Sequence, residues 1–287
     1  FLKSIFKKYN VETVYHAAAY KHVPLMEQNI SQCIRNNVLG TMNLAVSAST
    51  AGVKNFTLIS TDKAVMPSNY MGASKRLAEL VCQTIATQSP KTTFSIVRFG
   101  NVLGSSGSVV QLFEKQIKER SSLTVTHEEM TRFFMTIQEA AQLVVQAGSV
   151  AKGGDIFVLD MGKPIRILDL AKSMAALAGL EACSHETESK RPDKIFIKIT
   201  GIRPGEKLHE KLTFDDSLTP SIHPRIMRAK EQVSKSFSFS DLQRDINRST
   251  RQLDAKSIST LMKKYVTSEI DLKPSNDLLL EQQPPEL

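Results

Sequence analysis

The chain has 287 residues, of which 41% are hydrophobic and 23% are charged, and its net charge is +8 at pH 7. This balance is ordinary for a globular protein, and the length suffices for one large α/β domain or for one domain with a smaller lobe. No run of about 18 apolar residues occurs, so these residues predict no membrane-spanning helix.

The basic residues are scattered and often alternate with acidic ones, and aromatic residues make up only 6% of the chain. This pattern argues against nucleic acid as a partner and favours an anionic small substrate or an acidic membrane surface. The cysteines Cys33, Cys82 and Cys183 are odd in number and widely spaced. We therefore expect a reducing, cytoplasmic setting with no disulfide and no metal site.

Short apolar runs alternate with segments of helical spacing over most of the chain. Helices are expected at 1–10, 25–51, 70–88, 108–120, 137–147 and 167–178, and strands at 11–19, 53–60, 93–99, 123–125, 155–160 and 194–200. Gly52 follows the second helical segment, as a helix stop signal does. The strand–helix alternation predicts an α/β fold with a parallel sheet and helices on both faces.

The segment STDKAVMPSNYMGASKR (60–76) follows a predicted strand and leads into a predicted helix. Its first side chains lie at the carboxyl edge of the sheet, where doubly wound folds bind ligands. Thr61, Asp62 and Lys63 supply a hydroxyl, a carboxylic acid and an amine, which can serve as a hydrogen-bond donor, a general acid and a general base. By itself such a tripeptide is more often a solvated turn.

Tyr70 and Met71 both precede Lys75 on the predicted helix. At about 100° per residue, Met71 lies about 40° around the helix from Lys75, and Tyr70 lies about 140° away. Met71 therefore shares the face of Lys75, and Tyr70 does not.

Small residues follow the first predicted strand in HAAA (16–19), where a flat ring or a ribose could approach the backbone closely. Lys21 and His22 come directly after them. Taken alone, HAAA is more often plain helix–sheet packing, and the two basic residues are more often surface groups.

The loop RFGNVLGSSGS (98–108) runs from a strand to a helix start near Ser108. Backbone N–H groups at a helix start favour an anion. Arg132 and Arg203 suit a diphosphate, because guanidinium groups bind oxyanions bidentately. A flexible turn and two surface ion pairs are the alternatives.

Read together, five segments of the chain resemble the extended short-chain dehydrogenase/reductases. They are HAAAYKHVPLMEQN, STDKAV with MGASKR, RFGNVLGSSGSV, MTRFFMTIQEAAQLV and GIRPGEKLHEKL. More narrowly, residues 1–214 resemble the bacterial nucleotide-sugar 4,6-dehydratases of the polysaccharide-biosynthesis (CapD-like) group. The resemblance implies a UDP-N-acetylglucosamine 4,6-dehydratase that uses NAD or NADP. Sugar C4 is oxidised, C5 is deprotonated, water leaves from C6, and the hydride returns to C6.

Roles for individual residues come from this resemblance, by motif position. Lys63 is the expected C5 base, Asp62 the acid for the departing water, Thr61 a hydrogen-bond partner near the C4 oxygen, and Lys75 the holder of the nicotinamide ribose. Long, membrane-anchored members of the group have methionine where relatives have tyrosine, so Met71 marks that subgroup. Since Met71 cannot deprotonate the C4 hydroxyl, Thr61 relayed through water or Lys75 is the hypothesis for that step. The expected cofactor-binding residues are His16, Ala17, Ala18, Ala19, Asn37, Ser60, Lys75 and Phe99, and the expected substrate-binding residues are Lys21, His22, Asn101, Ser106, Ser108, Arg132, Arg203 and Glu206.

The resemblance also divides the chain. Residues 1–107 form a partial NAD(P)-binding Rossmann domain with the catalytic segment, 108–233 combine a substrate-binding lobe with the final Rossmann strands, and 234–287 form a polar, partly disordered extension. No GxGxxG or GxxGxxG turn occurs, although a dinucleotide fold needs one after its first strand. We therefore expect a doubly wound, Rossmann-like parallel sheet that lacks its first strands, in a C-terminal fragment of a longer protein. That protein is expected to be a homo-oligomer anchored at the cytoplasmic face of the bacterial inner membrane.

Two alternatives remain. A C4 epimerase or 4-reductase of the same superfamily has tyrosine at the Met71 position and usually lacks the Asp-Lys pair. A non-catalytic Rossmann binding protein has no need for an acid beside a base.

Overall fold

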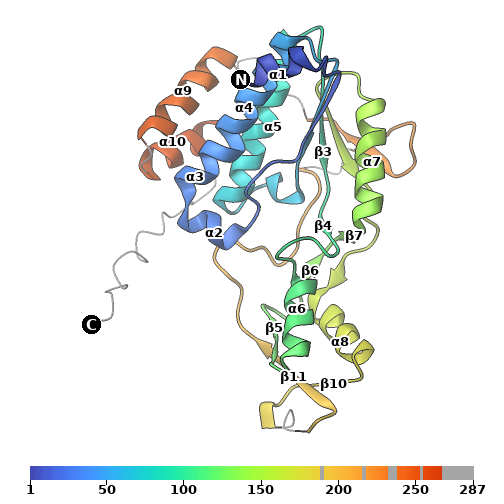
Figure 1. Ribbon diagram of the computed structural model, residues 1–287. Coiled ribbons are helices and arrows are strands. Elements are labelled where there is room, and N and C mark those ends of the chain that lie inside the picture. The colour runs from blue at the N-terminus through green and yellow to red at the C-terminus, as the bar shows by residue number, and fades with distance from the viewer. Residues whose placement is uncertain (188–190, 215–217, 232–237, 253–254, 267–287) are drawn as a thin grey trace.

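The largest sheet in the computed structural model, which describes residues 1–187, 191–214, 218–231, 238–252 and 255–266, has the strand order β1-β2-β3-β8-β13-β12 (Figure 1). Its parallel part consists of β1 (Thr13–His16), β2 (Asn55–Ile59), β3 (Thr93–Arg98) and β8 (Asp155–Leu159). The strands β13 (Ile226–Ala229) and β12 (Leu218–Pro220) extend it in antiparallel fashion. The predicted α/β fold with a mostly parallel sheet is confirmed.

Helices cover both faces of this sheet. On one face lie α1 (Leu2–Lys8), α4 (Thr41–Ala51) and α5 (Tyr70–Gln88), and on the other lies α7 (Ile137–Ser149) (Figure 1). Along β3, Phe94 and Ile96 pack with the α4 and α5 side, whereas Val97 packs with α7. A strand that is buried on both faces reads as a continuous apolar run, which is why the sequence revealed it.

The strand register brings the carboxyl ends of neighbouring strands together. His16 pairs with Leu58 across β1 and β2, and Ile59 pairs with Val97 across β2 and β3. The loops that follow these three strands therefore begin side by side.

A smaller lobe lies beyond this edge of the sheet (Figure 1). Its three parallel strands are β10 (Glu181–Cys183), β11 (Lys194–Ile199) and β5 (Leu123–Val125), which pack with α6 (Val109–Lys118) and α8 (Ile167–Leu177) around their own apolar cluster. Two short pairings join the lobe to the sheet: β4 (Asn101–Val102) with β7 (Phe134–Met135), and β6 (Thr131–Arg132) with β9 (Ile165–Arg166). Ser108 caps α6, as the predicted helix start required.

The segment predicted as one helix over 25–51 is broken in the structure. It consists of α2 (Val23–Gln28), α3 (Ile30–Ile34), a π-helical turn η1 (Arg35–Gly40) and α4. Asn29 interrupts the first part with φ −131° and ψ 48°. The predicted stop at Gly52 is confirmed, because that residue caps α4 with a φ of 80°.

Two further helices, α9 (Phe239–Gln252) and α10 (Ala255–Tyr265), lie in the region that was expected to be a polar extension. Leu242, Ile246, Ile258, Leu261 and Met262 are buried in the same apolar cluster as α4 and α5. The apolar residues of α9 and α10 recur at helical spacing within a polar composition. The two amphipathic helices were therefore not predicted, because only the overall polarity of the region was considered. Residues 267–287 of the extension predicted for 234–287 lie outside the described residues.

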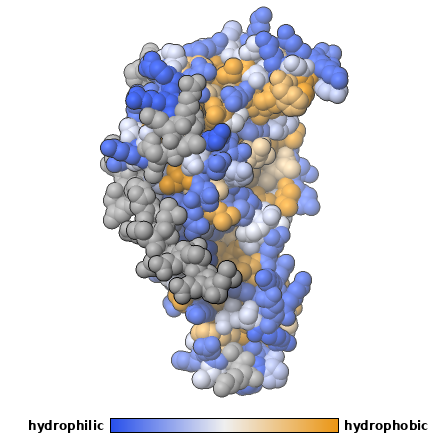
Figure 2. Space-filling model, turned by 60° about the vertical axis from the view of Figure 1, so that its left-hand side comes forward, coloured by the Kyte–Doolittle hydropathy of each residue, from blue (hydrophilic) through white to orange (hydrophobic). Residues whose placement is uncertain are grey.

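The visible surface is mainly hydrophilic, and its apolar residues form separate patches (Figure 2). Among the described residues, none of the helices combines the length and the apolar character needed to cross a membrane.

Candidate active site

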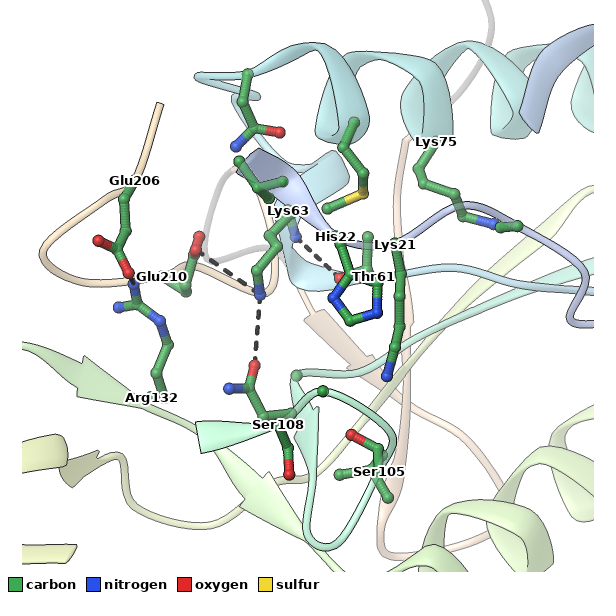
Figure 3. A pocket seen from close by; sticks show the side chains of 18 of the residues that line it. Lys21, His22, Thr61, Lys63, Lys75, Ser105, Ser108, Arg132, Glu206 and Glu210 are labelled. Atoms are coloured by element: carbon green, nitrogen blue, oxygen red, sulfur yellow. Dashed lines mark hydrogen bonds and ion pairs between the residues drawn. The ribbon is translucent and has the colours of Figure 1, made fainter. Parts of the chain in front are cut away.

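A cavity of about 600 Å³ opens at the carboxyl ends of β1, β2 and β3. Side chains from the loops after these strands meet there with side chains from α5 and from the segment after β11 (Figure 3). Predicted residues that line it are Ala17, Ala19, Lys21, His22, Ser60, Thr61, Lys63, Met71, Lys75, Phe99, Asn101, Ser108, Arg132, Arg203 and Glu206.

The Thr61-Asp62-Lys63 tripeptide forms a tight, hydrogen-bonded turn, because it begins the short 3₁₀ helix η2 (Asp62–Ala64). The Thr61 hydroxyl donates to Asp62 Oδ1 at 2.8 Å, and Lys63 Nζ donates to the same oxygen at 3.0 Å. The Asp62 side chain is fully buried, whereas Lys63 is 21% exposed and lines the cavity. Asp62 therefore lies beneath the pocket, and Thr61 and Lys63 connect it to the surface of the pocket.

Helix α5 presents Met71 and Lys75 to the same cavity. Asn69 caps the helix by accepting a hydrogen bond from the Gly72 N–H at 2.7 Å. Lys75 Nζ donates to the Ile59 carbonyl at 2.7 Å. Burial lowers the pKa of Lys75 to about 8, against the opposing effect of the Glu79 carboxylate.

Tyr70 is turned away from this cavity, as the helix geometry predicted. Its side chain is fully buried and hydrogen-bonds Ser259 on α10. Burial, and then the nearby Glu27 carboxylate, raise the pKa of the Tyr70 phenol. Tyr70 therefore serves the packing of α10 against α5 and offers no proton to the pocket.

Some predicted cofactor-binding residues do not line the cavity. His16 is buried and its Nε2 lies 2.8 Å from the Thr41 hydroxyl, and burial with the charge of Lys75 lowers its pKa to about 4. Asn37 bonds both backbone groups of Tyr20, at 2.7 and 2.9 Å. These two residues shape the loop after β1 from beneath. Ala18 and Ser106 are exposed and also lie outside the lining.

Ser60 rests on a buried charge network that the sequence analysis missed. Its hydroxyl donates to Glu79 at 2.6 Å, and Arg98 donates to both oxygens of Glu79 at 2.8 and 2.7 Å. Burial would raise the pKa of Glu79, but the charge and hydrogen bonds of Arg98, with Arg76 and Ser60, lower it to about 2. An arginine within an apolar strand was the available signal, because a buried charge needs a partner.

The two arginines predicted to bind a diphosphate differ in whether their guanidinium groups already have hydrogen-bond partners. Arg132 donates to the carbonyls of Thr131, Leu208 and Lys207 at 2.7, 3.1 and 2.9 Å, and lies 3.6 Å from Glu206. It therefore holds the segment after β11 in place. The Arg203 side chain is exposed at the rim and has no hydrogen-bond or ion-pair partner among the described residues, so it remains available to an anion.

The segment 203–210 is fastened to the loop between β2 and α5 (residues 60–69). Ser68 and Asn69 both donate to the Gly205 carbonyl, at 2.9 and 2.8 Å, and Lys207 Nζ donates to the Val65 carbonyl at 2.8 Å. Glu210 lines the cavity, with Oε1 3.8 Å from Lys63 Nζ. The sequence analysis singled out Arg203 and Glu206 in this segment but not Lys207 or Glu210, although GEKLHE offers further charged groups.

The sequence profile of the family described as "Polysaccharide biosynthesis protein" matches residues 1–231. The chain belongs to this family. Among relatives, CapD of Staphylococcus aureus, a capsular polysaccharide biosynthesis protein, is 54% identical over 226 residues, which cover 78% of this chain and 36% of CapD. An inverting UDP-N-acetylglucosamine 4,6-dehydratase of Campylobacter jejuni is 37% identical over 72% of this chain and 58% of its own. A UDP-glucose 4-epimerase of Rickettsia bellii is 32% identical over 94% of this chain and 74% of its own.

Solved structures agree on the fold of this polysaccharide biosynthesis family member. Pen from Bacillus thuringiensis superposes with a TM-score of 0.69 at 33% identity, covering 86% of this chain and 78% of Pen. DesIV, a dTDP-glucose 4,6-dehydratase from Streptomyces venezuelae solved with NAD bound, gives 0.61 at 20% identity, covering 74% of this chain and 66% of its own. The resemblance stated from the sequence is confirmed at the level of the family and the fold, and the chain spans about a third of the length of CapD.

Proposed function

We propose that this polysaccharide biosynthesis family member is a nucleotide-sugar 4,6-dehydratase that acts on UDP-N-acetylglucosamine. The observation that carries the proposal is the placement of Lys63, which is bonded to buried Asp62 and faces the same cavity as Met71 and Lys75. An acid beside a base at this point serves the removal of water from a sugar, and a binding protein needs neither. The dehydratase relative supports the same reaction class.

The cofactor side of the cavity suits the nicotinamide end of NAD or NADP. Ala17 and Ala19 leave room for a flat ring, while Ser60 and Lys75 supply polar groups that suit a ribose. When bound, the dinucleotide would supply the hydride-transfer chemistry that the oxidation at sugar C4 and the reduction at C6 require. Lys75 is mainly charged below pH 8, since burial brings its pKa to about 8, and this charge orients the ribose hydroxyls.

Lys63 acts as the C5 base in this proposal. In its neutral form the amine takes the C5 proton, the C5–H electron pair moves toward the C4 ketone, and the enolate then expels the C6 hydroxyl. The proton that makes this leaving group water originates from Asp62. Because Asp62 is buried beneath the pocket, its proton reaches the substrate through the Thr61 hydroxyl. That hydroxyl donates to Asp62 Oδ1 at 2.8 Å in this structure, so it must turn toward the leaving group and accept the Asp62 proton in its place.

Met71 has no proton to exchange, so the C4 hydroxyl must lose its proton to another group. Our candidate for accepting the proton of the C4 hydroxyl is Thr61, which would pass the proton on through water or Lys75. Lys21 and Arg203 line the cavity and would bind the diphosphate, and Asn101 and Ser108 would bind the sugar nucleotide. The excess of basic residues also suits a catalytic domain held against the anionic cytoplasmic face of a membrane. The expected homo-oligomer remains a separate proposal.

An epimerase is the second candidate, because one relative named as a UDP-glucose 4-epimerase aligns with 94% of this chain. Epimerisation at C4 needs no acid–base pair for C5 and C6, so the two activities predict different effects of changing Lys63.

The test is incubation of the gene's full-length product with NAD and UDP-N-acetylglucosamine, followed by mass spectrometry and NMR. Loss of one water with a new C4 ketone supports the dehydratase, and conversion to UDP-N-acetylgalactosamine overturns it in favour of the epimerase. Lys63→Ala should abolish dehydration, whereas Lys54→Ala, which removes an exposed lysine paired with Glu12, should not change it. Tight nucleotide binding without turnover would show a binding protein instead.

A further inference from the structure

The Lys63 amine lies between two carboxylates from distant parts of the chain. Asp62 Oδ1 is 3.0 Å from Nζ, and Glu210 Oε1 is 3.8 Å from it. The side chains of Asp62 and Glu210 are 0% and 4% exposed, whereas that of Lys63 is 21% exposed. The amine thus faces the cavity, with Glu210 beside it (Figure 3).

Glu210 is held in this place at an energetic cost. Its Oε2 is buried and accepts no hydrogen bond within the described part of the chain, and the Lys207 amine lies 3.9 Å away. A buried carboxylate that lacks hydrogen bonds is unfavourable unless charged neighbours compensate it. The Gly205 carbonyl and the Lys207 amine both bond the loop between β2 and α5, so the segment that leads to Glu210 is held in place on its N-terminal side.

We propose that Glu210 is a positioning residue for Lys63, which directs the amine at the sugar and stabilises the ammonium ion that forms when Lys63 takes the C5 proton. This inference rests on the proposed function, which gives Lys63 its chemical task. The proton moves from C5 to Nζ, so positive charge appears beside Glu210, and an opposite charge within about 4–6 Å favours it. Asp62 holds the proton for the departing water at that point, so the compensating charge comes from Glu210. Glu210 thereby favours the transfer of the C5 proton to Lys63.

The other charged groups around Lys63 do not replace Glu210. On the substrate-lobe side lie Lys207, Arg132 and Glu206, and across the cavity lie Lys21, His22 and Lys75. Most of these are cations, which oppose a second positive charge. Within the lining, Glu206 is directed at Arg132, 3.6 Å away, so Glu210 is the carboxylate of the substrate-lobe segment that reaches Lys63.

Glu210→Gln tests this with a nearly isosteric change, and Glu114→Gln on the exposed side of α6 is the control. Steady-state rates are measured against pH for both. Glu210→Gln should lower kcat by about 10- to 100-fold with little change in KM, and should move the rising limb of the pH–rate profile to lower pH. Glu114→Gln should match the wild type.

A second readout requires no turnover. Reductive methylation of Lys63, followed by peptide mass spectrometry, reports the pH at which the amine becomes neutral. The midpoint should lie at lower pH in Glu210→Gln than in the wild type, and Glu210→Asp should lie between them because its shorter side chain lengthens the ion pair. If Glu210→Gln does not fold, Glu210→Asp decides alone. An unchanged midpoint in the folded variants overturns the inference, whereas an enzyme that epimerises but shows the shift refutes only the proposed reaction.

Discussion

Replacing Gly72 with alanine tests how closely helix α5 must approach the loop between β2 and α5, which carries Lys63. A β-carbon on Gly72 would lie 2.2 Å from the carbonyl oxygen of Lys63 and 3.1 Å from its carbonyl carbon. Both are backbone atoms, so no change of rotamer relieves the overlap. The helix and the loop must separate by about 1 Å before the contact becomes an ordinary one.

Two opposing terms set the effect on stability. Overpacking of this kind costs about 1–3 kcal/mol, while alanine in place of glycine within a helix gains about 1 kcal/mol. The net loss in free energy of unfolding is therefore at most about 2 kcal/mol, or several degrees in Tm. The effect on activity is larger, because a shift of about 1 Å in a reacting group costs about 100-fold in rate.

Gly40→Ala is the matched control. Gly40 also has helical angles, with φ −59°, but the nearest atom to its added β-carbon is the Arg35 carbonyl oxygen at 3.7 Å. We expect this variant to keep its activity and to gain up to about 1 kcal/mol, measured by urea denaturation. The reasoning is refuted if Gly72→Ala and Gly40→Ala show the same turnover.

Three other changes probe the groups around Lys75. Tyr70→Phe should leave kcat within about twofold and lower stability by about 1 kcal/mol, because the hydroxyl bonds α10 rather than the substrate; a loss of 100-fold or more would make Tyr70 a proton donor after all. Met71→Leu conserves volume, so we expect a cost below about 1.5 kcal/mol and retention of most turnover, and a dead but folded enzyme would contradict this. The pKa of Glu79 is lowered from 4.5 to about 2, so its stabilisation is complete above pH 4.5 and is lost as the pH falls toward 2. Urea denaturation between pH 5 and about 2.5 should therefore show a smaller pH dependence in Glu79→Gln than in the wild type, and parallel curves would refute the linkage.

Local sequence pattern was sufficient for most of the sheet and for one face of the site. Buried strands are continuous apolar runs, and helices repeat every 3.6 residues, so β2, β3, β8 and α5 could be located without tertiary information. The same periodicity placed Met71 beside Lys75 and turned Tyr70 away, and the structure agrees. Strand ends in a parallel sheet share one edge, which is why Thr61 and Lys63 could be assigned to the pocket.

The hydrogen-bond and ion-pair partners of individual side chains could not be predicted from periodicity. Arg132 has the sequence setting of an anion-binding residue, but its guanidinium is occupied by three carbonyls and Glu206. His16 and Asn37 have the setting of cofactor-binding residues, but they support the loop after β1 from below. A side chain's partner depends on which backbone group folds within about 3 Å of it, and spacing along the chain does not contain that distance.

The sequence by itself therefore determined the strands, the helices and the edge at which an acid, an amine and a second lysine gather, because these follow from periods of a few residues. Only the tertiary structure decided that Asp62 lies beneath the pocket and that Glu210 faces Lys63. Those two facts depend on how a loop of the smaller lobe packs against the sheet edge, and that packing is fixed by contacts between residues far apart in the chain.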